Sequence, residues 1–213
     1  MKKFIYIAIV LTGLLTIQSC KKDYLDTVPT SSTSPTTVFS STGNAALAIN
    51  GLARMMTNQY LGSQGFNGEG TIKMYYGNYP GKDFYVNLPG WAAIINATYN
   101  ENTTSIYCYY PWYYYYKIIG NANTVITRID GAAGTDADRA FIKAQALTYR
   151  AYCYMMLAQL YGNRWSDSQN GATNGVVLRL DESTNPMPQS TLAETYAQIY
   201  KDLDDAIKLF TSS

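Results

Sequence analysis

The chain has 213 residues, a formal net charge of +1 and no histidine. So small a net charge creates no field that would attract nucleic acid or an acidic substrate, and the lack of histidine excludes His-based triads, histidine metal sites and histidine proton shuttles. Tyrosine is the outlier, with 21 copies, which indicates either an interaction surface or aromatic packing between helices.

The N-terminus has the build of a bacterial lipoprotein signal peptide. Residues 1–3 are short and basic, and residues 4–15 are apolar but too few to span a bilayer, which takes about 20 residues. Residues 17–20 read Ile-Gln-Ser-Cys and resemble a lipobox, in which the signal is cut before the cysteine and the cysteine is acylated. We therefore expect residues 1–19 to be removed and Cys20 to carry palmitate-type acyl chains that anchor the protein stably. The alternative is an ordinary signal peptide with a chance cysteine.

Residues 20–41 are rich in Ser, Thr and Pro. Such a composition cannot bury enough apolar surface to fold alone, so we expect a flexible tether that holds a folded domain, residues 42–213, away from the membrane. Lys21, Lys22 and Asp23 look like the charged tags of surface-exported lipoproteins in Bacteroidetes.

The first helix is expected over residues 43–60, where apolar residues recur at helical spacing and Ser41 or Thr42 offers a cap. Residues 61–110 are different, because glycines, prolines and aromatic residues are interleaved without any period. The aromatic content argues against disorder. We expect an ordered, loop-rich insertion with one short helix near residues 91–96.

Two strong helical patterns follow the insertion. The first covers residues 111–129, with Pro111 suited to the first turn. The second opens at Asp136 and is closed by Gly162. Because the connection between them is short, they should lie antiparallel as a hairpin.

A last helix begins at Thr191, which forms a capping box with Glu194. Its apolar stripe has no following partner in the chain, so we expect exposed apolar surface and a tendency to associate. Three aspartates lie largely off the stripe and are expected on the wet side: Asp202, Asp204 and Asp205.

The predicted fold class is therefore mainly α, built from tetratricopeptide-like antiparallel helix hairpins with a long loop-rich insertion. Cys108 and Cys153 lie among apolar and aromatic residues, which favours two buried thiols, with a disulfide as the alternative. Without histidine, only an oxygen-ligand Ca²⁺ site remains open, and no EF-hand spacing occurs. We expect no metal and no cofactor.

The most specific pattern is A-x-x-Y-R-A-Y-x-Y-x-x-L-x-x-x-Y-G over residues 146–162. Together with the lipobox, with WYYYYKIIGNANTVITRID and with PMPQSTLAETYAQIYKDLDDAI, it resembles the SusD/RagB family of surface glycan-binding lipoproteins of Bacteroidetes. The resemblance covers nearly the whole chain but only the N-terminal part of the family's usual length, so the chain looks like a truncated member.

The resemblance implies a helical scaffold on the outer face of the outer membrane. It implies a lid on a SusC-like TonB-dependent transporter as partner, an oligosaccharide ligand, no catalysis and no cofactor. In the family, an aromatic residue of the insertion stacks on sugar beside an asparagine. Trp91 matches that position best, with Asn96 or Asn100 as its polar partner, and Tyr99 and Asp83 lie close in sequence.

Sugar binding needs flat aromatic platforms with a few placed polar groups, which the insertion supplies. The alternative for Trp91 is a plug in a local core. Trp112 and Tyr116 are expected to pack between helices, and Arg150 to form a structural ion pair or cap.

Two other functions stay open. A glycan hydrolase would need two carboxylates across the scissile bond, and Glu69, Asp83 and Glu101 are the candidates in the insertion. A purely structural or interaction lipoprotein would use the tyrosines only for packing.

Overall fold

The structure is a computed structural model that describes residues 34–58, 66–82, 85, 87, 92–98 and 102–213. The signal peptide of residues 1–19, the lipidation site Cys20 and most of the tether lie outside the described residues. So do Asp83, Trp91, Tyr99 and Asn100 of the predicted ligand site. Residues Pro35–Ser213 form one compact unit.

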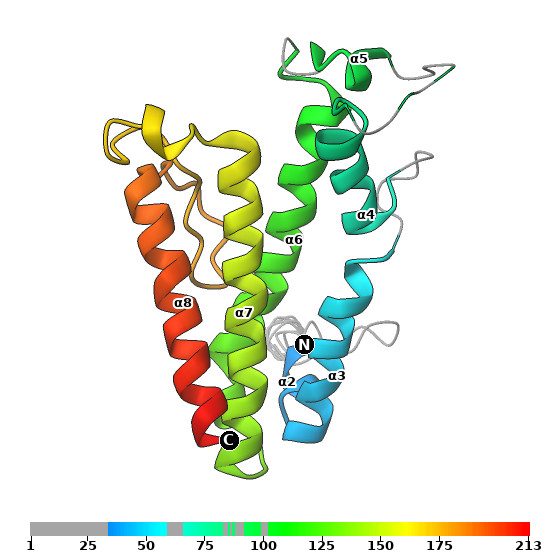
Figure 1. The fold of residues 1–213 in the computed structure, drawn as a ribbon. Helices are drawn as coiled ribbons and strands as arrows, with labels where there is room; N and C mark the ends of the chain where they lie inside the picture. Colours follow the sequence, from blue (N-terminus) through cyan, green and yellow to red (C-terminus); the bar gives the residue numbers. More distant parts are fainter. Residues whose placement is uncertain (1–33, 59–65, 83–84, 86, 88–91, 99–101) are drawn as a thin grey trace, which may run out of the picture. The chain divides into compact units, whose positions relative to one another are not determined.

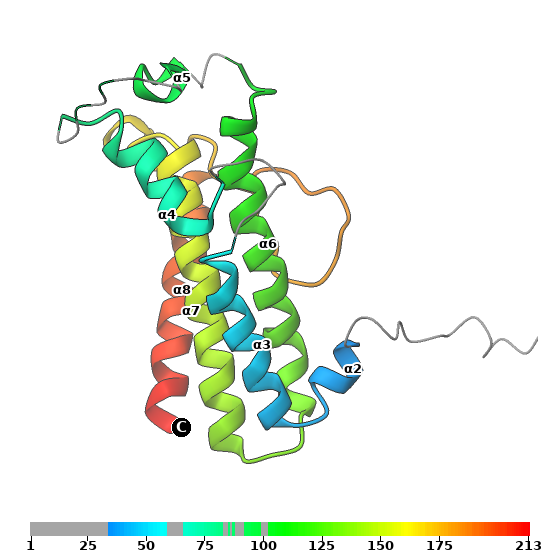
Figure 2. The same cartoon turned by 90° about the vertical axis from the view of Figure 1, so that its right-hand side faces the viewer.

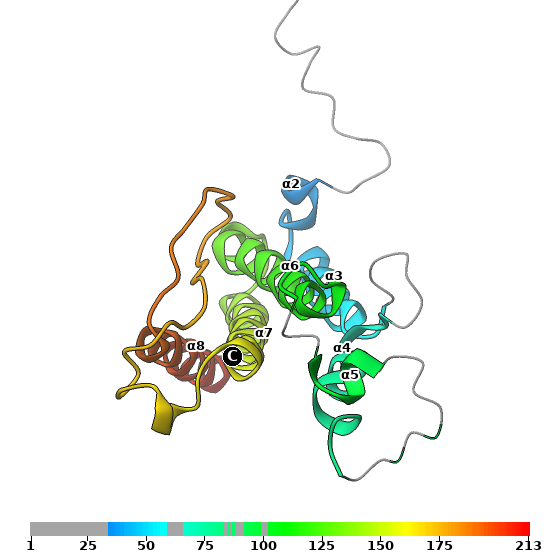
Figure 3. The same cartoon turned by 90° about the horizontal axis from the view of Figure 1, so that it is seen from above.

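Three long helices and one shorter helix form the scaffold of this unit. Helices α6 (Ile106–Arg128) and α7 (Asp136–Tyr161) form the expected antiparallel hairpin, joined through the short 3₁₀ turn η4 (Ile129–Gly131) (Figure 1). Helix α8 (Leu192–Ser212) packs along α7, and α3 (Thr42–Met55) packs against both α6 and α7. Seen from above, α7 therefore lies between α8 on one side and α3 and α6 on the other (Figure 3).

Several short elements complete the described part. A single turn, α2 (Pro35–Val38), lies within the range expected as tether, and η5 (Trp165–Asp167) follows α7. The insertion contains α4 (Gly68–Lys73), the π-helix η2 (Met74–Asn78) and α5 (Ala92–Ile95). Pairing of β type is limited, within these residues, to two isolated bridges. None of the described helices is long and apolar enough to cross a bilayer.

The helix ends agree with the capping pattern with two exceptions. Ser41 caps α3, and the Thr191–Glu194 capping box opens α8, both as predicted. Helix α3 ends at Met55, however, five residues before the expected end. Helix α6 begins at Ile106, so placing Pro111 in the first turn was wrong: Ser105 is the cap, and Pro111 lies inside the helix.

The α4–η2 helix was not predicted, and its position explains the early end of α3. The Glu69 N–H donates to the Met56 carbonyl at 2.9 Å, so the start of α4 lies directly on the end of α3. Gly68 has a φ of 63°, and a Cβ at this position would come within 2.1 Å of the Met56 oxygen. Only glycine fits this close approach.

Part of the tyrosine surplus lies in the core. Tyr110, Tyr114, Tyr115 and Tyr154 are fully buried between the helices. Buried tyrosine hydroxyls need a partner; that of Tyr110, for example, donates to the Gly68 carbonyl at 3.1 Å. Aromatic packing between helices, one of the two expected explanations, thus accounts for these four residues.

A buried ion pair joins α7 to α8. The Arg150 guanidinium donates to both carboxylate oxygens of Asp202, at 2.6 and 2.7 Å, and to the Asn123 amide oxygen at 2.9 Å. The structural ion pair expected for Arg150 is confirmed. The prediction that Asp202 is exposed to solvent was wrong, because Asp202 is only 1% exposed.

The same cluster holds the long connection between α7 and α8 against the hairpin. The Asn123 side-chain amide donates to the carbonyls of Arg179 and Asp181, both at 2.9 Å, and the Tyr116 hydroxyl donates to the Val177 carbonyl at 2.7 Å. Figure 2 shows this connection running beside α6. The connection is therefore fixed in place although it contains no regular strand.

Candidate functional site

Of the predicted ligand residues, only Asn96 lies in the described part of the chain. It is exposed at the end of α5, and its N–H donates to the Ala92 carbonyl at 2.9 Å. The next residue, Ala97, has a φ of 54°, and Ile94 anchors the short helix in the core. The grouping of Asn96 with Trp91 and its neighbours stays a prediction.

Glu69, one of the candidate acids, is buried between α4, α6 and α7. Its Oε1 accepts hydrogen bonds from the Tyr115 hydroxyl, at 3.2 Å, and from the Tyr152 hydroxyl, and the residue is only 7% exposed. The other two candidate acids, Asp83 and Glu101, lie outside the described residues. The position of Glu69 is that of an anchor for α4 rather than of an acid lining an open cleft.

An aromatic pocket lies at the N-terminal half of α6. It has a volume of about 520 Å³ and combines residues of η2, of α6 and of the last turn of α7. We call it the aromatic pocket. It is lined by Tyr76, Thr103, Tyr107, Cys108, Tyr109, Pro111, Trp112, Leu160 and Tyr161.

Aromatic rings define the walls of the aromatic pocket. The Trp112 ring meets the Tyr161 ring edge-on, with centroids 5.2 Å apart and an interplanar angle of 88°, and it also packs on Tyr116 at 4.7 Å. The expected packing of Trp112 and Tyr116 between helices is confirmed. Both side chains are only half-buried, and Trp112 additionally faces the pocket.

Tyr109, at the outer rim of the aromatic pocket, belongs to a stacked pair of rings. Tyr109, which is 49% exposed, stacks on Tyr113 with a centroid separation of 5.5 Å and an interplanar angle of 26°. The Lys117 ammonium lies 5.6 Å from the centroid of Tyr113. These three side chains follow one another at i, i+4 and i+8, so they share one face of α6.

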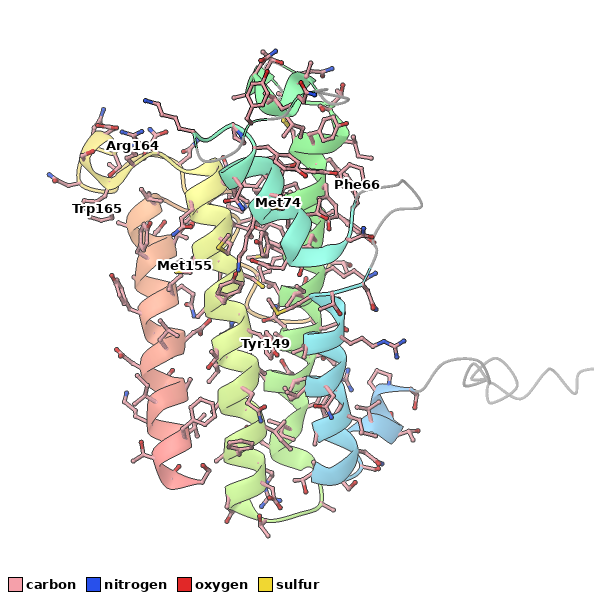
Figure 4. The ribbon with its side chains drawn as sticks, turned by 45° about the vertical axis from the view of Figure 1, so that its right-hand side comes forward. Phe66, Met74, Tyr149, Met155, Arg164 and Trp165 are labelled. Atoms are coloured by element: carbon pink, nitrogen blue, oxygen red, sulfur yellow. The ribbon has the colours of Figure 1, made fainter. Side chains whose placement is uncertain are left out.

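The inner side of the pocket rests on a second set of rings. Phe66, labelled in Figure 4, packs edge-on against Tyr110 at 4.7 Å and lies 5.9 Å from Tyr107. Tyr75 contacts both Phe66 and Tyr107 through ring edges, at 6.2 and 6.3 Å. The η2 segment and the start of α6 are thus held together by an aromatic cluster directly behind the pocket.

The chemistry of the aromatic pocket is uncharged. None of its nine lining residues has a carboxylate, an ammonium or a guanidinium group. Burial raises the pKa of the Cys108 thiol, so it stays protonated near neutral pH. Cys108 is half-buried, Cys153 is buried, and neither forms a disulfide. No cluster of potential metal ligands occurs among the residues that the structure places.

A second concave site, of about 720 Å³, lies between α7 and α8 at the other end of the hairpin. Its charged side chains pair with one another: Lys143 contacts Asp130 at 2.6 Å, and Lys201 contacts Asp205 at 2.5 Å. Because these charges are already paired, the groove provides no preformed ligand chemistry. The aromatic pocket is the better candidate.

Sequence reasoning missed the aromatic pocket because its residues come from three distant segments. Trp112 was singled out, but packing between helices was favoured over glycan contact for it, and Tyr76 and Tyr161 carry no local signal of their own. The one available signal was Pro111, since a proline inside a helix marks an irregular backbone.

A protein-family model matches residues 23–213; it is the SusD-like model, described as starch-binding and associating with the outer membrane. No curated protein matches the chain. Among solved structures, a SusD-like carbohydrate binding protein from Bacteroides vulgatus is 27% identical, with a TM-score of 0.68 over 80% of this chain and 36% of that one.

Two further structures show the same fold. A putative sugar binding protein from Bacteroides vulgatus is 23% identical, with a TM-score of 0.67 over 81% of this chain and 38% of its own. A SusD superfamily protein from Bacteroides thetaiotaomicron is 23% identical, with a TM-score of 0.62 over 79% of this chain and 37% of its own. The chain therefore spans well under half the length of these relatives.

Proposed function

The chain belongs to the SusD-like family, and on that premise we propose that it is a non-catalytic lipoprotein that binds oligosaccharides at the cell surface. In this proposal Cys20 carries the lipid anchor in the outer membrane, and the bound glycan is delivered to a SusC-like TonB-dependent transporter. The motif of residues 146–162, on which the resemblance was first based, covers the second half of helix α7 and its C-cap Gly162.

The aromatic pocket is the observation that supports glycan binding. A sugar ring has an apolar C–H face and a rim of hydroxyls, so its binding sites combine aromatic surfaces with a few polar groups. The pocket offers Trp112, Tyr109 and Tyr161 with nearby hydroxyls, and its volume falls in the usual range for small-ligand sites, about 300–1,000 Å³. Trp91, Asn96, Tyr99, Asn100 and Asp83 remain proposed contacts from the insertion.

The test is a binding measurement on a pocket variant with a matched control. Tyr109→Ala removes a half-exposed ring from the rim of the pocket, whereas Tyr200→Ala removes a 64% exposed ring from α8. Isothermal titration of the full chain in detergent with a panel of oligosaccharides should show a roughly 5- to 30-fold weaker Kd for Tyr109→Ala, equivalent to about 1–2 kcal/mol. Tyr200→Ala should bind as the wild type does.

The same preparation separates binding from the two alternatives. Incubation with a bound oligosaccharide should release no shorter products; cleavage that Asp83→Asn or Glu101→Gln abolishes would establish the hydrolase instead. Equal binding by wild type and Tyr109→Ala would remove the pocket from the proposal. Absence of binding to every glycan tested would favour the structural lipoprotein.

A further inference from the structure

We propose that Pro111 is a positioning residue for the ligand site: it opens helix α6 where the aromatic pocket lies, and two tyrosine hydroxyls hold the opening. The inference rests on the proposed glycan binding for its ligand but on separate observations for its mechanism. In this proposal the shape of the pocket depends on an interruption of the α6 hydrogen-bond ladder at Pro111, and a single substitution of that proline should close the interruption.

The first observation is the carbonyl that Pro111 leaves without its helical donor. In an α-helix each N–H donates to the carbonyl four residues earlier, and proline has no N–H. The Tyr107 carbonyl, four residues before Pro111, instead accepts a hydrogen bond from the Tyr76 hydroxyl of η2. Tyr76 thus satisfies the polar group that the proline exposes and ties η2 to α6.

The second observation is a hydroxyl at the next rung of the helix. The Trp112 N–H donates to the Tyr161 hydroxyl at 3.1 Å, and that hydroxyl donates to the Cys108 carbonyl at 2.6 Å. Cys108 O is the acceptor that the Trp112 N–H would have in a regular helix. A side chain bridging a helical N–H and its usual acceptor is a recognised cause of a local opening.

The break and the pocket are made of the same residues. The two tyrosines, the proline and the three residues whose backbone groups they satisfy all line the aromatic pocket: Tyr76, Tyr107, Cys108, Pro111, Trp112 and Tyr161. Tyr76 lies at the centre of the π-helix Met74–Asn78, and single π turns occur frequently at functional sites. Two walls of the pocket therefore depend on the interrupted part of α6. Tyr76 holds the η2 wall through the Tyr107 carbonyl, and Tyr161 holds the α7 wall through the Cys108 carbonyl.

Substitution of Pro111 should uncouple affinity from stability. In Pro111→Ala the restored N–H can donate to the Tyr107 carbonyl, which strengthens α6 and competes with the Tyr76 hydroxyl. We expect an unchanged or raised thermal midpoint together with a Kd for oligosaccharide weakened at least ~10-fold. Pro188→Ala, at an exposed proline of the α7–α8 connection, is the matched control and should change neither quantity.

A double-mutant cycle tests the hydroxyl bond without any ligand. Tyr76→Phe leaves the Tyr107 carbonyl without a donor and should lower the thermal midpoint in the wild-type background. In the Pro111→Ala background the new N–H replaces the lost hydroxyl, so the same substitution should have a clearly smaller effect. This rescue of stability without rescue of glycan binding is a result that a merely structural proline would not produce.

The outcomes separate this inference from the proposed function. If the wild-type chain binds no oligosaccharide, the proposed function fails, while the cycle still decides whether Tyr76 stands in for the missing N–H. If the wild type and Pro111→Ala bind equally well, only the present inference fails. It also fails if Pro111→Ala does not fold, or if Tyr76→Phe has the same effect in both backgrounds.

Discussion

At the scale of single residues, the buried ion pair between Arg150 and Asp202 is the most demanding contact in the described part of the chain. Two charges removed from water are tolerated only when they pair with good geometry and further hydrogen bonds. Asp202 accepts two bonds from Arg150 and one from the Gln198 amide at 2.7 Å, and Arg150 also reaches Asn123. Loss of either charge would leave the other buried and uncompensated.

We predict that Asp202→Asn lowers the free energy of unfolding by about 3–5 kcal/mol, because it leaves Arg150 as an unpaired buried cation. Urea denaturation followed by circular dichroism measures the effect. Asp204→Asn, two residues along the same helix but exposed, is the control and should stay within about 0.5 kcal/mol of wild type. Equal effects of the two substitutions would mean that Asp202 is not buried as the structure has it.

The two aspartates also show what periodicity can and cannot predict. The apolar periodicity of α8 correctly predicted the helix and its apolar face. Periodicity does not predict, however, that a charged residue such as Asp202 is buried by pairing with a residue of the neighbouring helix α7. Arg150 was assigned correctly because a cation in the middle of an apolar helix needs such a partner. The partner itself could not be named from sequence, since Arg150 and Asp202 lie 52 residues apart.

At the scale of secondary-structure elements, the length of each helix determined whether it could be predicted from the sequence. Helices α6, α7 and α8 run for 23, 26 and 21 residues, long enough for a 3.6-residue period to emerge. The α4–η2 segment carries Gly68, Gly70 and Gly77 within six α-helical and five π-helical residues. Glycine disfavours a helix interior, and the period changes midway, so tertiary contacts and not local propensity stabilise this segment.

The outer face of α8 carries an apolar surface that the described part of the chain leaves exposed. Tyr200 and Ile207 are 64% and 63% exposed and lie seven residues apart, hence on one face. Phe210 is also partly exposed and meets Phe141 of α7 edge-on at 5.7 Å. The last helix thus has exposed apolar surface as expected, but the predicted reason was wrong, because Leu192, Ile199 and Ala206 of the apolar stripe are buried and α8 packs along α7.

We predict that this face makes the isolated chain associate at high concentration. The double variant Tyr200→Lys with Ile207→Lys should reduce the sedimentation coefficient at high protein concentration toward that of a monomer, because charges interrupt the apolar surface. Thermal unfolding should change little, since both side chains are largely solvated in the folded state. Association that persists unchanged in the variant would place the contact elsewhere.

At the scale of the whole molecule, we expect the proposed lipid anchor at Cys20 to decide where the protein works. We predict that protein purified from the membrane fraction has an N-terminus at Cys20 and carries acyl chains, detected by intact mass spectrometry. Cys20→Ala should move the protein out of that fraction, because no acceptor for the acyl chains remains. An unmodified Cys20 in membrane-bound protein would contradict the lipobox interpretation of residues 17–20.

The dependence of stability on pH should also be a property of the whole chain, because it follows from the tyrosine-rich core and the absence of histidine. Burial, assisted by the neighbouring Tyr107 and Tyr79, raises the pKa of Tyr75 from 10.0 to about 12. Burial likewise raises the pKa of the other core tyrosines above its ordinary value: Tyr115, Tyr116, Tyr152 and Tyr154.

A tyrosine whose pKa is higher in the folded state favours that state while it is protonated. Its contribution is complete below pH 10.0, the ordinary value, and is lost as the pH rises toward the folded-state value near 12. We therefore predict a nearly constant free energy of unfolding from about pH 6 to 9, where no histidine titrates, and a steep fall above pH 10.

Phenolate absorbance and the helical signal, followed together in one alkaline titration, measure this dependence. The exposed tyrosines, such as Tyr85 and Tyr200, should ionise first without loss of helix. The buried tyrosines should ionise only as the helical signal disappears, because a phenolate without a counter-charge is not tolerated between α6 and α7. Complete phenolate formation with the helices intact would mean that the tyrosine core is open to solvent.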